Sequence, residues 1–310
     1  MIGHYVALIK RELWEHRSIF VTPIAIASIV TLGTLTALVF VGEFQQELNL
    51  AIFGAQNVAG DTERKAVLTG LVVGSSWLFL LGLGVLTVLD ARESLYAERK
   101  DKSILFWRSR PVTAAVTVVS KLLTALVVIP TVAMVGIIAT HLINLVVTSI
   151  WVSTKGGDAG MLIWGSVSFL DNWLAMIVVL YAISIWMSPF VGWFLFVSAW
   201  TKRSPLLMAF LPLVLVPMIE GIFLRSAHFA EAVWGRAAQI PIFAGIDIER
   251  FFDDENPMHG AANMPEEMVS LLTHLAPGKF VASIDMWIGL VVCGLLTTAA
   301  IYVRRYRDES

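Results

Sequence analysis

The sequence predicts an all-α integral membrane protein with six transmembrane helices, and three observations support that prediction. Of the 310 residues, 57% are hydrophobic and 15% are charged, whereas about a quarter of the residues in an ordinary soluble domain are charged. Six apolar runs are long enough to cross the ~30 Å hydrocarbon core of a bilayer, which takes about 20 helical residues. The basic residues also gather in alternate connections, as they do in multi-pass proteins.

The apolar runs place the six spans along the chain. They cover residues 19–41, 67–89, 116–152, 173–200, 206–224 and 284–303. The third run is overlong, and a turn near Pro130 would divide it into two spans. In the fourth run, Trp186, Trp193 and Trp200 recur every seven residues, so a continuous helix would place them on one face.

Charge decides between six spans and seven. With six spans and a cytoplasmic N-terminus, most of the 22 basic residues lie in cytoplasmic segments. These are Lys10, Arg11, Arg17, Arg92, Arg99, Lys100, Lys102, Arg108, Arg110, Lys121, Lys202, Arg203, Arg304, Arg305 and Arg307. Dividing the third run would move the last five of them outward, against the positive-inside rule. We therefore expect six spans and two cytoplasmic termini.

Residues 1–18 are expected to form an amphipathic helix before the first span. Acidic Glu12 and Glu15, and the lack of a cleavage site, argue against a cleaved signal peptide. The apolar residues at helical spacing on one side are Tyr5, Leu8, Ile9, Leu13 and Trp14. Such a helix lies in the plane of the membrane interface. It is either an elbow helix packed beside the first span or a positive flank that only sets orientation. The residues assigned to the elbow are Tyr5, Lys10, Arg11 and Trp14.

The connection at residues 90–115 is dense in charge, yet it contains the apolar sequence Ile-Leu-Phe-Trp at 104–107. Ser94 is expected to cap a short helix that Pro111 ends, because the residue before a proline is pushed out of the α region. A short charged helix with an exposed aromatic pair is typical of a docking element. The alternative is a loop whose aromatic rings dip back into the lipid headgroups.

This connection resembles the signature cytoplasmic loop of ABC-2 type permeases, the membrane subunits of ATP-binding-cassette transporters. The matching positions are Glu98, Arg99, Lys100, Asp101, Lys102, Ser103, Ile104, Leu105, Phe106, Trp107, Arg108, Ser109, Pro111, Val112, Ser120 and Lys121. The resemblance extends more weakly to the N-terminal helix, the six-span order, the long segment before the last span and the RRYRDE ending.

The resemblance implies a coupling helix that seats in a groove of a separate ATPase subunit. The residues assigned to ATPase coupling are Glu98, Arg99, Lys100, Asp101, Ser103, Phe106, Trp107 and Arg108. It also implies two copies of the ATPase, which would bind ATP and magnesium. A second permease, identical or related, is expected to complete the complex in a bacterial cytoplasmic membrane, most plausibly for export.

The segment 225–283 is expected to be extracytoplasmic, with helices at 227–238 and 265–275. By resemblance it would cap the translocation route. Its acidic group at 253–255, with His259, matches no EF-hand or zinc spacing, so no metal site is predicted.

Polar residues within the spans offer two interpretations. His141, Asn144 and Thr148 in the third run either line a translocation pathway or make hydrogen bonds between helices, and the second is favoured. Gly70 and Gly74 form a small-residue pair that suggests close helix packing.

Several function classes are disfavoured. The chain has no G-x-x-x-x-G-K-[ST] phosphate loop, so ATP hydrolysis is expected in a partner chain, and no H-E-x-x-H or nucleophile motif points to an enzyme. A net charge of −2 gives no reason to expect nucleic acid. An ion-coupled transporter would need a midplane carboxylate, which is not apparent. An ABC-2-like complex that signals or assembles rather than transports stays open.

Overall fold

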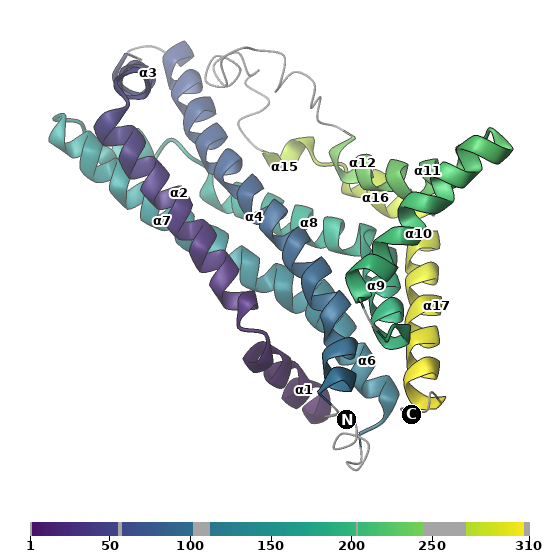
Figure 1. Cartoon of the computed structure of the whole chain (residues 1–310). Coiled ribbons are helices and arrows are strands. Elements are labelled where there is room, and N and C mark those ends of the chain that lie inside the picture. Colours follow the sequence, from purple (N-terminus) through teal and green to yellow (C-terminus); the bar gives the residue numbers. More distant parts are fainter. Residues whose placement is uncertain (1, 55–57, 102–111, 203, 245–270, 307–310) are drawn as a thin grey trace.

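The computed structural model describes residues 2–54, 58–101, 112–202, 204–244 and 271–306, and within them it contains helices and no strands (Figure 1). The helices of the first half are α1 (Ile2–Glu15), α2 (Ser18–Phe40), α3 (Gly42–Phe53), α4 (Val58–Lys100), α6 (Ala114–Leu123) and α7 (Ile129–Thr154). Those of the second half are α8 (Phe169–Trp186), α9 (Ser188–Trp200), α10 (Pro205–Ile219), α11 (His228–Ala230), α12 (Arg236–Ala238), α15 (Leu271–His274), α16 (Pro277–Ala282) and α17 (Ile284–Tyr306). A 3₁₀ turn covers Pro241–Phe243, and π-helical segments cover Thr124–Val128, Gly160–Trp164, Glu220–Leu224 and Glu231–Gly235.

Six helical stretches are long and apolar enough to cross a membrane. They are Ser18–Phe40, Arg64–Lys100, Ala114–Thr154, Phe169–Trp186, Pro205–Leu224 and Ile284–Tyr306. Their order and number confirm the sequence prediction of six spans. The chain is therefore an all-α, multi-pass membrane protein. The N-terminal helix α1 and the C-terminal end of α17 lie at the same end of the helices (Figure 1).

The third run is continuous, as predicted, and the structure shows how it accommodates Pro130. A proline in a helix removes one N–H donor and leaves the carbonyl four residues earlier without its partner. That carbonyl belongs to Leu126, in the π-helical segment, and it accepts a hydrogen bond of 2.7 Å from Ser184 Oγ of α8. A neighbouring helix thus satisfies the freed backbone group, which lipid could not do.

The fourth run is not one helix, which corrects the prediction for residues 173–200. Helix α8 ends at Trp186 and α9 begins at Ser188, with Pro189 in its first turn. Proline is favoured at the start of a helix and disrupts the interior of one. Trp186 and Trp193 consequently lie on different helices and share no continuous face.

The second span also differs from the prediction, because α4 continues to Lys100. Ser94 lies inside the helix and donates to the carbonyl of Ala91, so it caps nothing. Residues 90–100 are mostly good helix formers and contain no glycine or proline, so nothing ends the helix earlier. Helix α6 begins after Thr113, whose side chain accepts from Val116 N–H. The predicted connection at 90–115 is therefore helical over its first eleven residues.

Helices α9 and α17 approach closely, and Gly192 permits it. A Cβ at Gly192 would lie 3.1 Å from the carbonyl oxygen and 3.2 Å from the Cα of Cys293, which is tighter than usual packing. The apolar core around α9 includes Leu95, Val118, Phe194 and Leu195. Helix α9 thus packs against both α4 and α17.

The predicted helix at 227–238 is confirmed, because α11, the π segment and α12 run without a break from His228 to Ala238. Of the second predicted helix, only α15 is within the described residues. These helices and α16 lie at the end opposite α1 (Figure 1). Arg236 fastens them to the spans: its guanidinium donates to the carbonyls of Trp186, at 3.0 Å, and Asp285, at 2.7 Å, and it stacks over the Trp186 ring.

Candidate functional site

Charged side chains from four helices, and from the turn that follows α1, meet at the α1 end of the molecule. We call them the charge cluster. It consists of Arg11 and Glu12 of α1, His16 of the turn after α1, Asp90 and Glu98 of α4, Lys121 of α6, and Arg304 of α17.

The centre of the cluster is a buried lysine between two carboxylates. Lys121 Nζ lies 2.7 Å from Glu12 Oε1 and 3.3 Å from Glu98 Oε1. All three residues are at most 5% exposed. Glu12 and Lys121 are 109 positions apart in the sequence, so this contact joins the N-terminal helix to the beginning of the third span.

Glu98 connects the centre to two further cations. Arg304 Nη2 lies 2.7 Å from Glu98 Oε2, and Arg11 Nη2 lies 3.3 Å from Glu98 Oε1. Arg11 also pairs with Glu15 at 2.7 Å. Burial alone would lower the pKa of Arg11, but the bond to Glu15 and the nearby carboxylates outweigh it and raise that pKa. Arg11 therefore stays charged, and Glu98 holds α1, α6 and α17 around the end of α4.

His16 forms the other edge of the cluster. Its Nδ1 lies 3.5 Å from Asp90 Oδ1 and its Nε2 lies 3.8 Å from Glu12 Oε2. Asp90 is 5% exposed. The turn between α1 and α2 is thus held against α4 by a side chain that both neighbouring carboxylates attract.

The cluster contains three carboxylates, Glu12, Asp90 and Glu98, and three cations, Lys121, Arg11 and Arg304. Taking an ion out of water costs several kcal/mol, which opposite charges and hydrogen bonds must offset. Such a group is therefore sensitive to the loss of any member, since the remaining partner would be buried and unpaired. A cluster of this kind fixes the relative position of its four helices.

A further contact fastens the last turn of α4 to α9. Arg99 Nη2 donates to the carbonyls of Ser198 and Thr201, at the C-terminal end of α9. Helix ends leave carbonyls without intrahelical partners and favour a cation there. The turn of α4 that precedes the 102–111 segment is therefore held by α1, α6, α9 and α17.

The residues assigned to ATPase coupling divide into three groups. Glu98 and Arg99 are bonded within the chain, and their contact with a partner stays a prediction. Lys100 and Asp101 are exposed at the end of α4. Ser103, Phe106, Trp107 and Arg108 lie outside the described residues.

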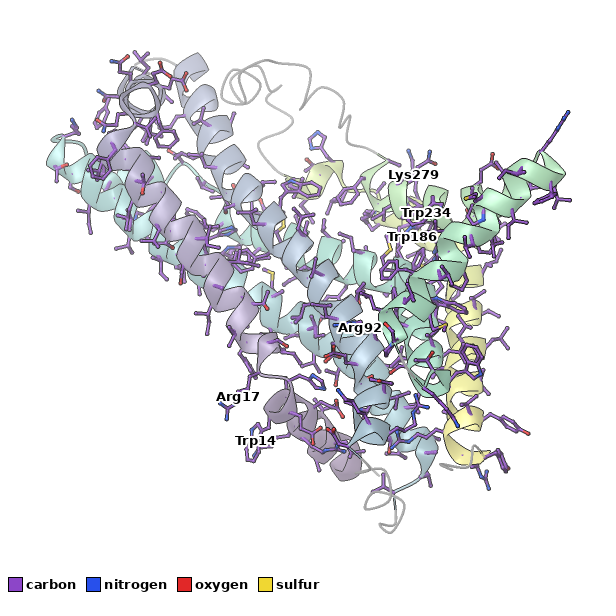
Figure 2. All side chains as sticks on the ribbon, in the orientation of Figure 1. Trp14, Arg17, Arg92, Trp186, Trp234 and Lys279 are labelled. Atoms are coloured by element: carbon purple, nitrogen blue, oxygen red, sulfur yellow. The ribbon has the colours of Figure 1, made fainter. Side chains whose placement is uncertain are left out.

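Helix α1 confirms the predicted amphipathic helix but presents a different face. Leu8 and Glu12 are buried, one helical turn apart, whereas Trp14 is 73% exposed. Figure 2 shows Trp14 and Arg17 pointing away from the other helices. Lys10 is exposed above the Trp14 ring, and the side chain of Tyr5 is outside the described residues. Helix α1 packs mainly against α6 rather than beside the first span.

The polar residues predicted in the third run line a cavity of about 340 Å³, together with Gly70 and Gly74. His141 accepts from Trp173 Nε1 at 3.2 Å and shares a hydrogen bond of 3.1 Å with Ser76, which supports the helix-to-helix interpretation. Asn144 and Thr148 line the cavity, and Asn144 Oδ1 has no hydrogen-bond partner among the described residues. A Cβ at Gly74 would meet nothing within 4 Å, so this glycine makes no close helix contact in the monomer.

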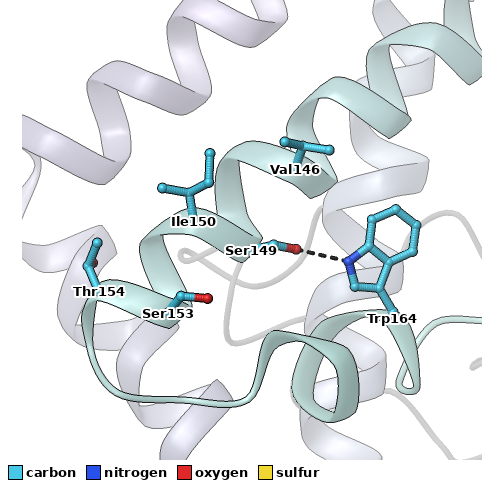
Figure 3. Close-up of a pocket in the computed structure, with 6 residues that line it drawn as sticks. All are labelled: Val146, Ser149, Ile150, Ser153, Thr154 and Trp164. Atoms are coloured by element: carbon cyan, nitrogen blue, oxygen red, sulfur yellow. Dashed lines mark hydrogen bonds between the residues drawn. The ribbon is translucent and has the colours of Figure 1, made fainter.

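A shallower pocket of about 450 Å³ lies at the far end of α7 (Figure 3). Its lining is mostly apolar, and its indole donor, Trp164 Nε1, is already bonded to Ser149 Oγ at 3.0 Å. This pocket offers no arrangement of groups for chemistry.

Comparisons with known proteins give no match: no family model, no curated protein and no solved structure is similar to this chain.

The charge cluster is the part of the site that sequence reasoning missed. Glu12 served only to argue against a cleaved signal peptide, Lys121 was counted among the cytoplasmic basic residues, and Arg304 was part of a basic ending. One signal was present: Glu12 follows Leu8 by four residues, so it falls within the apolar face of α1 rather than opposite it. A charge on a buried face calls for a partner, although the sequence does not say which residue it is.

Proposed function

We propose that this chain is the membrane-spanning permease subunit of an ABC-2 type transporter, most simply an exporter, driven by a separate ATPase. The observation that carries the proposal is the sequence from Glu98 to Val112, with its Phe-Trp pair, between two helices that the charge cluster ties together. A partner that pushes on this segment would act on α4 and α6 at once, and through them on α1 and α17.

The proposed partners follow from the same resemblance. Two ATPase subunits, which bind ATP and magnesium, would dock on residues 94–111 of two permeases, this chain and an identical or related one. The complex would span a bacterial cytoplasmic membrane with both permease termini in the cytoplasm. Closure of the ATPases would move the α4–α6 ends and bias the spans between two arrangements, as rigid-body switches do.

Helix α1 would serve as the elbow helix of this permease. Its exposed Trp14 suits the headgroup level of a bilayer, where amphipathic rings are favoured. Its buried face reaches the charge cluster, so a movement of α4 would be passed to the membrane surface. The helices at 228–238 and 277–282 would cap the opposite end of the route.

The test is co-purification from the native membrane in mild detergent, with an ATPase assay on the complex. The wild-type chain is expected to bring down a partner that has a phosphate loop. The double variant Phe106→Ala/Trp107→Ala is expected to insert normally and to lose this partner. A matched control is Phe40→Ala/Phe223→Ala, which removes two rings that are 80% and 77% exposed elsewhere.

Three outcomes would contradict the proposal. A chain that purifies alone, with no ATPase after crosslinking, would favour an ion-coupled transporter. A partner retained equally by both double variants would remove the docking role of Phe106 and Trp107. A complex that hydrolyses ATP without moving any substrate would instead favour the signalling or assembly alternative.

A further inference from the structure

A groove between α2 and α4 combines an apolar length with a charged end. Its volume is about 550 Å³. The apolar lining comes from both helices and includes Ile26, Ile29, Leu78, Leu81, Val85 and Leu89. The helices touch at Gly82, where an added Cβ would collide with the side chain of Ile26. Side chains as exposed as Leu81 and Val85, at 66% and 62%, face the bilayer.

The charged end of the groove lies at the α1 end of the molecule. It is formed by His16, Asp90, Arg92 and Glu93. Asp90, Arg92 and Glu93 follow Leu89 in α4, so they lie in the next helical turn after the apolar lining of the groove. Figure 2 labels the exposed Trp14 and Arg17 beside α1, and Arg92 above them. Lipid headgroups occupy such a level, with acyl chains along the apolar length.

Two atoms at this end are buried without hydrogen-bond partners in the described part of the chain. One is an acceptor, Asp90 Oδ1, which lies 3.5 Å from His16 Nδ1. The other is a donor, Arg92 Nε. The Nη2 atom of Arg92 is paired with Glu93 at 2.6 Å. Buried polar atoms are nearly always bonded, so an unpaired acceptor and donor in one groove call for a ligand that offers both.

We propose that this groove binds a zwitterionic phospholipid whose head group ends in a primary ammonium. The ammonium donates to Asp90 Oδ1, the phosphate accepts from Arg92, and one acyl chain lies along α2 and α4. A quaternary ammonium has no N–H to donate. A head group with only negative charge would face Asp90 and Glu93 with a single arginine to attract it. The site is defined by the chain's own contacts and does not depend on the proposed function.

The test is native mass spectrometry of the delipidated full-length protein, titrated with three lipids that share the same acyl chains. They are phosphatidylethanolamine, phosphatidylcholine and phosphatidylglycerol. The ethanolamine lipid is expected to bind roughly tenfold tighter than the other two, as charge-assisted hydrogen bonds would give. Equal binding of all three, or preference for the glycerol lipid, would overturn the proposal.

Two variants test separately the binding of the lipid head group and the binding of the acyl chain. Asp90→Asn is expected to bind the ethanolamine and choline lipids equally, because it removes the charge that selects the ammonium. Val85→Trp, at an exposed position that tolerates a larger side chain, is expected to lose binding of every lipid by filling the groove. Leu215→Trp on α10, which is also exposed, is the matched control and should bind as the wild type does. A Val85→Trp protein with unchanged binding would exclude the groove.

A second copy of the chain is the competing occupant. Val85→Cys in membranes would then form a disulfide between two copies under mild oxidation, whereas a lipid-filled groove leaves the thiol monomeric. The native Cys293 is buried. An efficient Val85→Cys crosslink would overturn the lipid assignment.

Discussion

The two ends of the molecule hold their cations in different ways: one cation is buried and the other is half-buried. At the α1 end, Lys121 lies between the carboxylates of Glu12 and Glu98. At the opposite end, Arg236 lies against backbone carbonyls and the ring of Trp186. Burial lowers the pKa of Arg236, while the charge of Asp285 opposes that effect. The charges at the α1 end are stabilised by one another, whereas the charge of Arg236 is stabilised mostly by neutral groups. The first end should therefore lose more stability when one residue is removed.

The largest effect is expected for Lys121→Met, which leaves Glu12 and Glu98 buried without their shared cation. Removing one partner of a buried ion pair typically costs about 3–5 kcal/mol. Thermal unfolding of the detergent-solubilised protein would report the loss as a large fall in Tm. Lys155→Met is the matched control, because Lys155 is exposed at the end of α7 and its loss should leave Tm nearly unchanged.

The double variant Glu12→Gln/Lys121→Met sharpens the first prediction. If the cost comes from an uncompensated charge, neutralising Glu12 should recover part of the lost stability, and the two substitutions should be strongly non-additive. Additive losses would show that Lys121 acts by packing alone.

Much of the fold could be predicted from the sequence, because the bilayer imposes a simple requirement on each span. A run of about 20 apolar residues is sufficient to identify a spanning helix, and the six spans follow from that rule. Two helix boundaries were predicted wrongly. The break at Met187 was missed, and the second span was ended at residue 89 although α4 continues to Lys100. The fourth run was predicted as one span without regard to Pro189, which lies in the first turn of a new helix. The charges at 90–100 were expected to separate the second span from a short helix capped by Ser94, although α4 continues through them.

The candidate site was predictable only in part, because its contacts join residues far apart in sequence. The 98–112 motif and the polar group at His141 could be found as local patterns. The pairing of Glu12 with Lys121, and of Glu98 with Arg304, depends on how α1 and α17 pack against α4 and α6. No local pattern specifies that packing.

A smaller effect is expected for Arg236→Gln at the opposite end. The substitution removes charge-assisted bonds to two carbonyls and the contact with the Trp186 ring, but it leaves no charge buried alone. Hydrogen bonds to charged groups contribute about 1.5–3 kcal/mol, so the loss should fall near 2 kcal/mol. The same thermal measurement applies, with Lys279→Gln as an exposed control. A loss equal to that of Lys121→Met would break the comparison between the two ends.

The smallest effect is expected for Glu15→Gln, at the rim of the charge cluster. Glu15 pairs with Arg11 at 2.7 Å, but its side chain is 46% exposed and Arg11 keeps its contact with Glu98. Exposed ion pairs contribute about 0–1 kcal/mol, because water already solvates both partners and salt screens them. Tm should therefore shift by little, and less at high salt. A loss comparable to that of Lys121→Met would show that the rim is as tightly coupled as the centre. Stability would then differ between the two ends of the molecule, and not between the buried centre of the cluster and its exposed rim.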